Sequence, residues 1–442
     1  MKERCDNNLT VLDNLEPKKV FKYFEDMTKI PHGSGNEKGI SDFLVEFAKK
    51  RSLEVIQDTA LNVIIKKPAT PGYENSTPVI IQGHMDMVCE KNNEKVHDFE
   101  KDELELRIID DYIYANGTTL GADNGIAVAF GLALLDSDDI PHPPLELLIT
   151  TGEETGMYGA IALEPKYLSG KVLLNIDSEE EGVFLVSCAG GITSNVYISN
   201  QWESAKNPAL KLYIKGLKGG HSGMEIIKQK GNANKLMGRL LYQISKEILF
   251  NIAYISGGAK NNAIPREAET IITTDSKNLE TVKQIAENAI NIFKNEFRVQ
   301  DPDIVLEIED VKVEKQLSKD ETNKIISLLN LMPNGVQTMS KNIDGLVESS
   351  LNLGVIEFNE EKVTLISAIR SSVKTLKDEI VDRIKILSLL LEAKAETHSD
   401  YPEWQYEPDS VIRELCIATF KEIHGYNPKI DAIHAGLECG LL

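Results

Sequence analysis

The chain has 442 residues, of which 42% are apolar and 26% are charged, a balance that is typical of a globular protein and excludes a disordered one. Its length predicts two domains, each large enough to bury a core of its own. There are 48 Lys and Arg residues against 69 Asp and Glu, so the formal net charge is −21. Because such a negative surface repels phosphate backbones and anionic lipids, we expect neither a nucleic-acid partner nor a membrane partner.

The N-terminus and the cysteines indicate the compartment. The first fifteen residues contain no apolar run behind their charges, so we expect no signal peptide. Apolar runs such as 145–149 have the length of a strand and are too short to span a membrane. The five cysteines are odd in number and lack C-x-x-C spacing, which argues against a disulfide framework and fits the reducing cytosol.

The first part of the chain predicts an α/β layer. Residues 17–51 have helical periodicity that is interrupted at 31–35, and Asn36 is the expected N-cap of a second helix that ends near Arg51. A further helix is expected at 126–135. Short β-rich runs lie at 62–67, 79–82, 104–109, 112–115, 145–150 and 172–176. Strands that alternate with helices predict a mixed, mostly parallel sheet with flanking helices.

From about Ser194 the pattern changes to an α+β arrangement. Strands are expected at 210–214, 252–256, 269–274, 304–311, 354–358 and 362–368. Helices are expected at 232–249, 279–296, 319–330 and 374–395. After a turn-rich segment, helix 409–424 and strand 429–433 return to the α/β pattern. We therefore predict an α/β domain made of residues 1–189 and 398–442, split by an inserted α+β domain at 190–397.

The first chemical motif is Gly83-His84-Met85-Asp86, at the end of the apolar run 79–81. Ligands bind at the carboxyl ends of strands in open α/β sheets. In an extended segment His84 and Asp86 point to the same side, and a carboxylate commonly fixes the tautomer of a metal-binding imidazole. Taken alone, the pair is a weak signal, and a histidine and an aspartate on the surface are the favoured interpretation.

Three more carboxylate motifs follow in chain order. Asp123 lies between glycines in Gly121-Ala122-Asp123-Asn124-Gly125, a loop that can present one carboxylate or simply form a turn. Glu153 and Glu154 end the apolar run 145–150, where one can bind a metal while the other faces a water molecule. Asp177 ends the run 172–176. One histidine and several carboxylates at strand ends, without a cysteine, suit zinc, cobalt or manganese.

These motifs, together with the segment Asn175-Ile176-Asp177-Ser178-Glu179, resemble the M20 family of co-catalytic zinc metallopeptidases. Within that family the chain is most similar to the aminoacyl-histidine (Xaa-His) dipeptidases. The supporting segments are G-G-H-S-G at 219–223, N-A-I-P-R at 262–266, A-I-R-S-S at 368–372 and H-A-G-L-E-C-G at 434–440. The resemblance extends along the whole chain.

The resemblance implies a role for each residue of the predicted metal site. His84 and Asp177 would hold one of two metal ions, Glu154 would hold the other, and Asp123 would bridge them. Asp86 would orient His84. Glu153 would be the general base toward water and then the general acid toward the leaving amine.

The resemblance also implies that the domain 190–397 is a lid over the active site and that it supports a homodimer. The alternative is a lid with an internal duplication, which would complete the active site within one chain. The resemblance further implies that His221 stabilises the tetrahedral intermediate, that Arg370 binds the C-terminal carboxylate of a peptide, and that Asn262 is a further polar contact. A solvated turn histidine and a surface arginine are the simpler alternatives for His221 and Arg370.

The sequence departs from the family at its end. The similar dipeptidases carry another metal-binding histidine beyond the segment 434–440, whereas this chain stops at Leu442 and His434 matches the histidine of the segment itself. We therefore expect a truncated sequence that lacks the last strand and helix of the catalytic domain. If the chain ends here naturally, the second metal lacks a ligand.

The sequence thus predicts a cytosolic enzyme that hydrolyses unblocked dipeptides, Xaa-His dipeptides among them, with two divalent ions. One alternative is an aminoacylase, tripeptidase or carboxypeptidase of the same family. The other is a catalytically silent metal-binding protein that acts through its lid.

Overall fold

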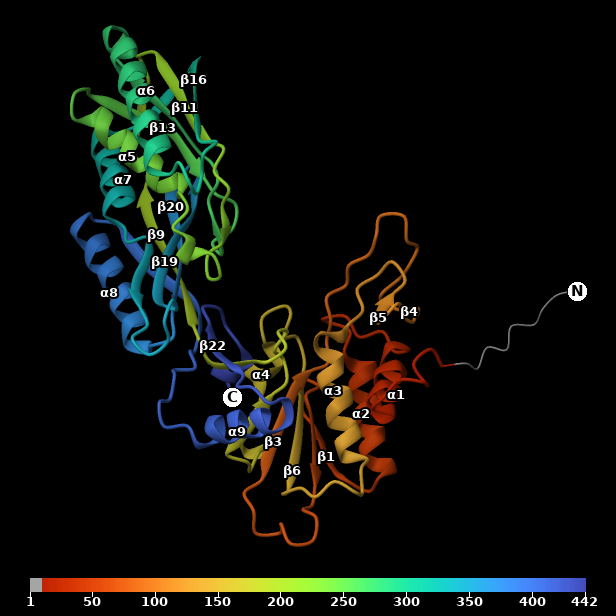
Figure 1. Ribbon diagram of the computed structural model, residues 1–442. Helices are drawn as coiled ribbons and strands as arrows, with labels where there is room; N and C mark the ends of the chain where they lie inside the picture. Colours follow the sequence, from red (N-terminus) through yellow and green to blue (C-terminus); the bar gives the residue numbers. More distant parts are fainter. Residues whose placement is uncertain (1–9) are drawn as a thin grey trace, which may run out of the picture. The chain divides into compact units, whose positions relative to one another are not determined.

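The computed structural model describes residues 10–442 (Figure 1). Its internal contacts group the chain into two compact units. The first contains the described residues up to Val183, together with Glu414–Gly425 and Leu442, and the second contains Phe184–Arg413 and Tyr426–Leu441. Cys5 and most of the segment examined for a signal peptide lie outside the described residues. The domain boundaries at 190 and 397 stay predictions.

A five-stranded mixed sheet forms the centre of the first unit, in the order β1-β2-β6-β3-β7. Its strands are β1 Glu54–Gln57, β2 Val63–Lys67, β3 Val79–His84, β6 Leu145–Thr150 and β7 Val172–Asn175. β3 runs parallel to both of its neighbours, whereas β1, β2 and β6 pair antiparallel. The predicted mixed α/β sheet is confirmed, and its parallel part is the portion around β3. The carboxyl ends of β6, β3 and β7 therefore share one edge of the sheet.

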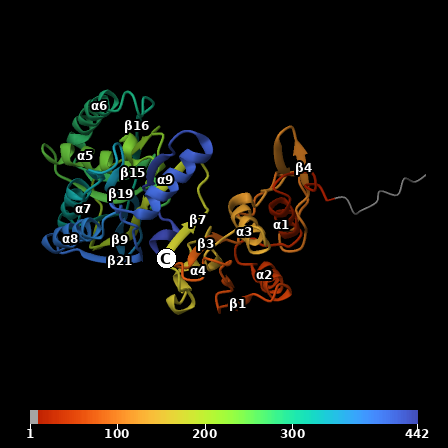
Figure 2. The ribbon, with the colours of Figure 1, turned by 60° about the horizontal axis from the view of Figure 1, so that its bottom comes forward.

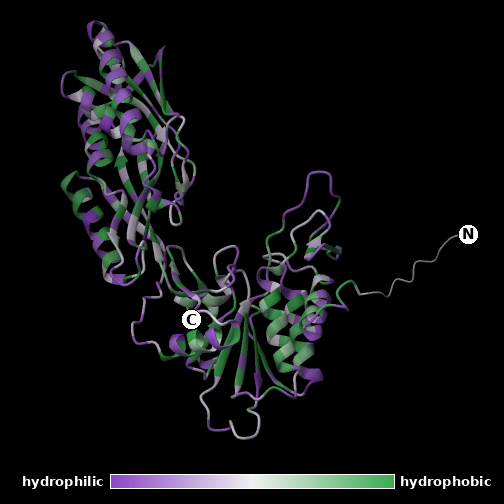
Figure 3. Ribbon diagram, viewed as in Figure 1, coloured by the Kyte–Doolittle hydropathy of each residue, from purple (hydrophilic) through white to green (hydrophobic). Residues whose placement is uncertain are grey.

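Both faces of this sheet are buried. Val63 and Ile65 of β2 belong to the cluster that the helices of this unit complete, whereas Ile64 between them belongs to a second cluster. This alternation follows from the period-two geometry of a strand. The helices of the first cluster are α1 Lys18–Thr28, α2 Lys38–Lys50 and α3 Ala122–Leu135. Figure 3 shows that apolar residues gather in these helices and in the strands beside them.

Among the described residues, the first unit contains five further elements. They are the hairpin strands β4 Leu106–Ile109 and β5 Tyr112–Ala115, the helices α4 Tyr158–Ala162 and η1 Pro165–Tyr167, and most of α9 Val411–His424. One boundary differs from the prediction. The second helix starts at Lys38 with Glu37 as its N-cap residue, not Asn36, because Asn36 still belongs to the preceding turn, in which its backbone N–H bonds to the carbonyl of Gly33.

A nine-stranded antiparallel sheet dominates the second unit, with β18 paired to β19 beside the main order β16-β11-β15-β13-β19-β20-β9-β21. Its strands are β9 Gly190–Ser199, β11 Ala209–Lys215, β13 Phe250–Gly257, β15 Ala268–Thr274, β16 Val305–Val311, β18 Gly335–Met339, β19 Val347–Phe358, β20 Lys362–Ser371 and β21 Lys394–Tyr401. Three two-stranded pairs accompany it: β8 Val183–Cys188 with β22 Lys429–Ile433, β10 Trp202–Ser204 with β17 Lys315–Leu317, and β12 Gly220–His221 with β14 Ala263–Ile264.

Four helices cover one face of the nine-stranded sheet (Figures 1 and 2). They are α5 Ala233–Ser245, α6 Leu279–Glu296, α7 Lys319–Leu331 and α8 Lys374–Leu390. Each contributes to the same core, for instance through Leu240, Phe293, Leu328 and Ile384. Single turns of 3-10 helix complete the unit at η2 Ile226–Lys228, η3 Ser276–Asn278 and η4 Glu438–Gly440.

The predicted helix 374–395 is too long. It ends at Leu390, Glu392 adopts a positive φ of 54°, and β21 begins at Lys394. The reason is tertiary, because β21 pairs antiparallel with β9, which lies almost two hundred residues earlier in the chain. The sequence prediction also omitted several strands, among them β1, β8, β9 and β18.

Two global expectations can be compared with the structure. Within residues 10–442, no helix combines the length and the apolar character needed to cross a membrane. The four cysteines within the same residues, Cys89, Cys188, Cys416 and Cys439, are free thiols.

Candidate active site

The end of strand β3 carries His84, and the neighbouring loop fixes its backbone. Oδ1 of Asn124 accepts a hydrogen bond from the backbone N–H of His84 at 3.2 Å, and Nδ2 of Asn124 donates to the carbonyl of Ile176 at 2.7 Å. Asn124 thereby ties the ends of β3 and β7 together. A Cβ atom on Gly83 would lie 2.4 Å from Oδ1 of Asn124, so only glycine fits there. Sequence analysis did not identify Asn124, although it is part of the quoted Asp123 motif.

The imidazole of His84 is buried, and each of its two ring nitrogens faces carboxylate or carbonyl oxygens. Nδ1 lies 3.0 Å from the backbone oxygen of Asp86 and 3.4 Å from its Oδ1. Nε2 lies 3.1 Å from Oδ1 of Asp123, 3.6 Å from Oδ1 of Asp177 and 4.0 Å from Oε2 of Glu153. When the ring is neutral and its proton is on Nδ1, directed at Asp86, the lone pair of Nε2 faces the side where the carboxylates lie, as a metal ligand requires.

Asp86 is buried and connects three parts of the site. Its carboxylate accepts hydrogen bonds from the backbone N–H groups of Glu153 at 3.0 Å and Glu154 at 3.3 Å, and from Oγ of Ser34 at 2.8 Å. Burial by itself raises the pKa of Asp86, but His84 and these donors lower it below its ordinary value. Asp86 therefore stays ionised while it holds the Glu153–Glu154 turn beside His84.

Ser34 was missed as a site residue. The segment 31–35 was read only as an interruption between two helices, and its contact with Asp86 crosses 52 positions of sequence. The glycines around Ser34 were the one available signal, because they indicate an irregular loop rather than a helix.

His84, Asp123 and Glu154 form a potential metal site. Each offers one ligand atom, and the three atoms all lie within 4.8 Å of one another. Burial, followed by the charge of Asp123, raises the pKa of Glu154. Burial lowers the pKa of His84, but the hydrogen bonds that its ring donates to the carboxylates of Asp123, Asp177 and Asp86 outweigh burial and raise that pKa. The cluster thus has an excess of negative charge that a divalent cation would neutralise.

The three predicted substrate contacts lie in the second unit. His221 pairs with Ala263 in the β12–β14 ladder, which brings it next to the exposed Asn262. A Cβ atom on Gly223 would lie 3.1 Å from Cε1 of His221 and 3.3 Å from Nε of Arg370, so these two side chains flank the same glycine. The second unit therefore brings His221, Asn262 and Arg370 into one neighbourhood.

The ring of His221 has a defined tautomer. Its Nδ1 accepts hydrogen bonds from the backbone N–H groups of Gly223 at 3.3 Å and Met224 at 3.1 Å. Burial and then the charge of Arg370 lower the pKa of His221, so its neutral form is favoured. The proton of that neutral ring is on Nε2, which leaves Nε2 as a hydrogen-bond donor.

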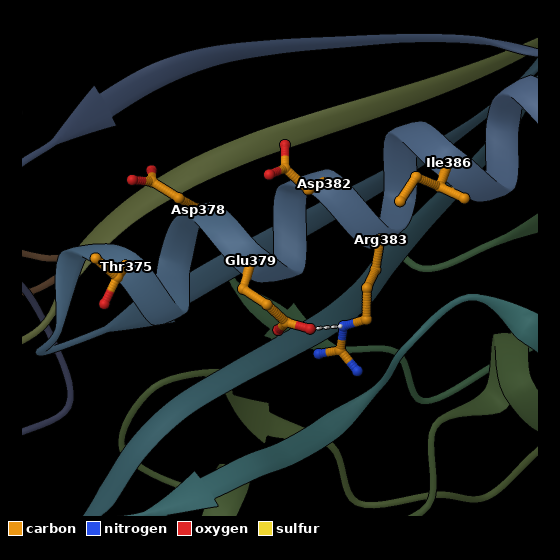
Figure 4. A pocket seen from close by; sticks show the side chains of 6 residues that line it. All are labelled: Thr375, Asp378, Glu379, Asp382, Arg383 and Ile386. Atoms are coloured by element: carbon orange, nitrogen blue, oxygen red, sulfur yellow. Dashed lines mark ion pairs between the residues drawn. The ribbon is translucent and has the colours of Figure 1, made fainter.

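Two pockets of the second unit contain none of the predicted site residues. One, of about 360 Å³, lies along helix α8, where Glu379 and Arg383 form an ion pair at 3.0 Å (Figure 4). The other, of about 480 Å³, is lined mainly by charged side chains that include Lys324 and Lys394. The chemistry of the side chains, not the size of a cavity, identifies the candidate site.

Comparison with known proteins gives a consistent result. The family model for the peptidase dimerisation domain of M20 peptidases matches residues 212–301. The chain is 40% identical to the cytosol non-specific dipeptidase of Escherichia coli K12 over 436 residues, which cover 98% of this chain and 90% of that protein.

Solved structures agree with this relationship. The crystal structure of aminoacylhistidine dipeptidase from Vibrio alginolyticus superposes with a TM-score of 0.92 at 39% identity, covering 98% of this chain and 89% of that one. Aminopeptidase PepT from Bacillus cereus superposes with a TM-score of 0.52 at 16% identity, covering 96% and 86%, which shows a similar fold only.

Proposed function

Because the chain belongs to the M20 family of metallopeptidases and is a peptide hydrolase of the dipeptidase type, we propose that it cleaves unblocked dipeptides, including Xaa-His dipeptides, with two divalent metal ions. The observation that carries this proposal is the close cluster of His84, Asp123 and Glu154, with Glu153 beside it. The 40% identity to a dipeptidase over nearly the whole chain supports the same substrate class.

His84 and Asp177 are proposed to hold one ion, Glu154 the other, and Asp123 both. These side chains fit divalent ions in their chemistry. They offer one imidazole nitrogen and several carboxylate oxygens without a thiolate, a set that suits zinc, cobalt or manganese. The negative charge that raises the pKa of His84 and of Glu154 supports cation binding at this place. When bound, such ions lower the pKa of a water molecule and polarise the scissile carbonyl.

Glu153 is proposed as the general base and general acid. Its Oε2 lies 4.0 Å from Nε2 of His84, close to the cluster but not among the three atoms that form it. A carboxylate in that position can accept a proton from the attacking water and donate it to the nitrogen of the leaving amine as the C–N bond breaks. Asp86 is proposed to orient His84, since it faces Nδ1 of that ring.

The second unit is proposed to supply the contacts with the substrate. Nε2–H of His221 is suited to stabilise an oxyanion, and Arg370 is suited to bind the terminal carboxylate of a dipeptide through its planar guanidinium. Asn262 is proposed as a further polar contact. This assignment is consistent with a lid at 190–397 and a catalytic domain formed by 1–189 and 398–442.

The matched dimerisation domain supports a homodimer as the proposed assembly, with a small peptide as the substrate. The name of the Escherichia coli relative supports a cytosolic location, which we also propose.

Substitution Glu153→Gln tests the mechanism. We expect hydrolysis of a dipeptide such as Ala-His to fall by about 10²- to 10⁴-fold, the usual contribution of general acid–base catalysis. The metal content, measured by elemental mass spectrometry, should match the wild type, because Glu153 is not a proposed ligand. Unchanged hydrolysis would refute Glu153 as the base.

Substrate class is tested separately by comparing Ala-His with N-acetyl-histidine. Cleavage of the free dipeptide alone supports a dipeptidase, whereas cleavage of the N-acetyl compound alone would make the protein an aminoacylase with the same chemistry. Absence of hydrolysis with full metal content would favour the silent metal-binding protein.

A further inference from the structure

Four residues form one row across neighbouring strands of the second unit. Ser350 on β19 pairs with Arg370 on β20, Arg370 pairs with Gly191 on β9, and Gly191 pairs with Tyr401 on β21. Residues opposite one another in antiparallel strands point to the same face of the sheet. The side chains of Ser350, Arg370 and Tyr401 therefore share one face, with a glycine between the last two.

The missing side chain at Gly191 lets Arg370 reach Tyr401. These two residues are on strands two positions apart, a separation of about 10 Å between backbones. A Cβ atom on Gly191 would lie 2.4 Å from both Cζ and Oη of Tyr401, so the phenol ring fills the space above this glycine. Nη1 of Arg370 donates a hydrogen bond to the hydroxyl of Tyr401 at 2.8 Å.

The backbone that carries the phenol is also held in place. Nζ of Lys377 on helix α8 donates to the backbone oxygen of Tyr401 at 2.9 Å and forms ion pairs with Asp400 at 2.8 Å and Glu403 at 3.1 Å. The side chain of Lys377 is only 4% exposed. The backbone of Tyr401 is thus anchored to helix α8, while its ring lies over Gly191 with the hydroxyl directed at Arg370.

Arg370 has no carboxylate partner in an ion pair within residues 10–442, and its buried Nε has no hydrogen-bond partner there. On the other side of the row, Oγ of Ser350 is 2.7 Å from Nε2 of His434. Burial, followed by the charge of Arg370, lowers the pKa of His434, so the neutral ring is favoured there. A guanidinium held by neutral groups keeps its full charge and its remaining donors for an anion.

We propose that Tyr401 is a positioning residue, which fixes the guanidinium of Arg370 for the terminal carboxylate of the substrate. This inference rests on the proposed role of Arg370 in the dipeptidase. It adds that the affinity of Arg370 for the terminal carboxylate of the substrate depends on the hydroxyl of Tyr401, which lies next to Arg370 across Gly191.

The test is Tyr401→Phe, assayed with a dipeptide and with the same dipeptide as its C-terminal amide. We expect kcat/KM for the free dipeptide to fall about 10-fold or more, mainly through KM, because a hydrogen bond to a charged group is lost. The value for the amide should stay the same, so the preference for a free carboxylate should shrink by the same factor.

Two further variants separate positioning from structure. Tyr254→Phe removes another hydroxyl of the second unit, which bonds to Ser256 at 3.0 Å, and should leave the preference unchanged. The double variant Tyr401→Phe/Arg370→Ala should match Arg370→Ala alone, because Tyr401 acts only through Arg370. Equal losses on the free and amidated substrates, or an unchanged preference in Tyr401→Phe, would overturn the inference.

Failure of the proposed function gives a different result. If the wild type cleaves N-acetyl amino acids and not dipeptides, the dipeptidase proposal fails. The N-acetyl amino acid also has a free carboxylate, so comparing it with its amide tests Tyr401 in the same way.

Discussion

Oδ1 of Asp123 lies 3.1 Å from Nε2 of His84, although 39 positions separate the two residues in the chain. Asp123 comes from the start of α3, where its φ of −85° and ψ of 106° are not helical, and His84 ends β3. The start of α3 therefore lies against the end of β3, which places a carboxylate oxygen beside the nitrogen that would bind a metal ion.

Replacement of His84 by alanine should remove metal and activity together. The variant loses the nitrogen ligand that faces the carboxylates, so we expect fewer metal ions per chain and no measurable dipeptide hydrolysis. Elemental mass spectrometry gives the stoichiometry. His398→Ala, at an exposed histidine of the second unit, serves as the control and should keep both properties. Full metal content in the His84 variant would contradict the assignment.

Asp86→Asn should weaken metal binding, because Asp86 faces Nδ1 of His84 and orients its ring. An amide cannot accept hydrogen bonds from Glu153, Glu154 and Ser34 as a carboxylate does, and the orientation of His84 is then lost. We expect metal affinity to fall about 10- to 100-fold, as for other partners of metal-binding histidines.

Ser34→Ala provides a graded comparison with Asp86→Asn. It removes one of the hydrogen bonds to Asp86, so its effect on metal affinity should be smaller, about 10-fold or less. Competition against a chelating dye measures both variants. A larger effect for Ser34 than for Asp86 would show that the loop acts by another route.

Asp301→Asn should destabilise the loop that carries His221. The fully buried carboxylate of Asp301 accepts from the backbone N–H groups of Lys218 and Gly231, both at 2.7 Å, which lie on either side of His221. An amide leaves one of these donors without an acceptor, at a cost of about 1–3 kcal/mol in the free energy of unfolding. Urea denaturation measures the change.

The exposed Asp303 offers the matched control for Asp301. Asp303→Asn should change the free energy of unfolding by no more than about 0.5 kcal/mol. Equal effects of the two substitutions would mean that the two hydrogen bonds of Asp301 contribute nothing to stability.

His434 should make stability depend on pH. Burial, followed by the charges of Arg370 and His221, lowers the pKa of His434 to about 3. Between that value and the ordinary pKa of about 6.5, the unfolded chain binds a proton that the folded chain does not. The contribution of His434 is therefore complete above pH 6.5 and is lost as pH falls, by up to about 1.4 kcal/mol per pH unit.

His434→Gln removes this titration. The difference in unfolding free energy between the wild type and the variant, measured by urea denaturation from pH 4 to pH 7, should shrink steadily toward acid. A difference that stays constant over this range would exclude a depressed pKa at His434.

The amino-acid sequence by itself determined the local elements whose patterns are strong. Strands β5, β6 and β22 and helix α6 have the predicted bounds, because each pattern is complete within its own segment. The same holds for the chemistry at the ends of β3, β6 and β7. His84, Asp123 and Glu154 were identifiable from motifs, since glycines and strand ends mark where a carboxylate can be presented.

Only the tertiary structure decided what depends on distant partners. Helix α8 ends early because the following residues pair with β9, and no local pattern records that pairing. Ser34 joins the site only through its contact with Asp86, and Tyr401 meets Arg370 only because Gly191 leaves room between their strands. A side chain's hydrogen-bond partner is set by the packing of strands and loops, so residues that act through a neighbour leave no pattern in their own segment.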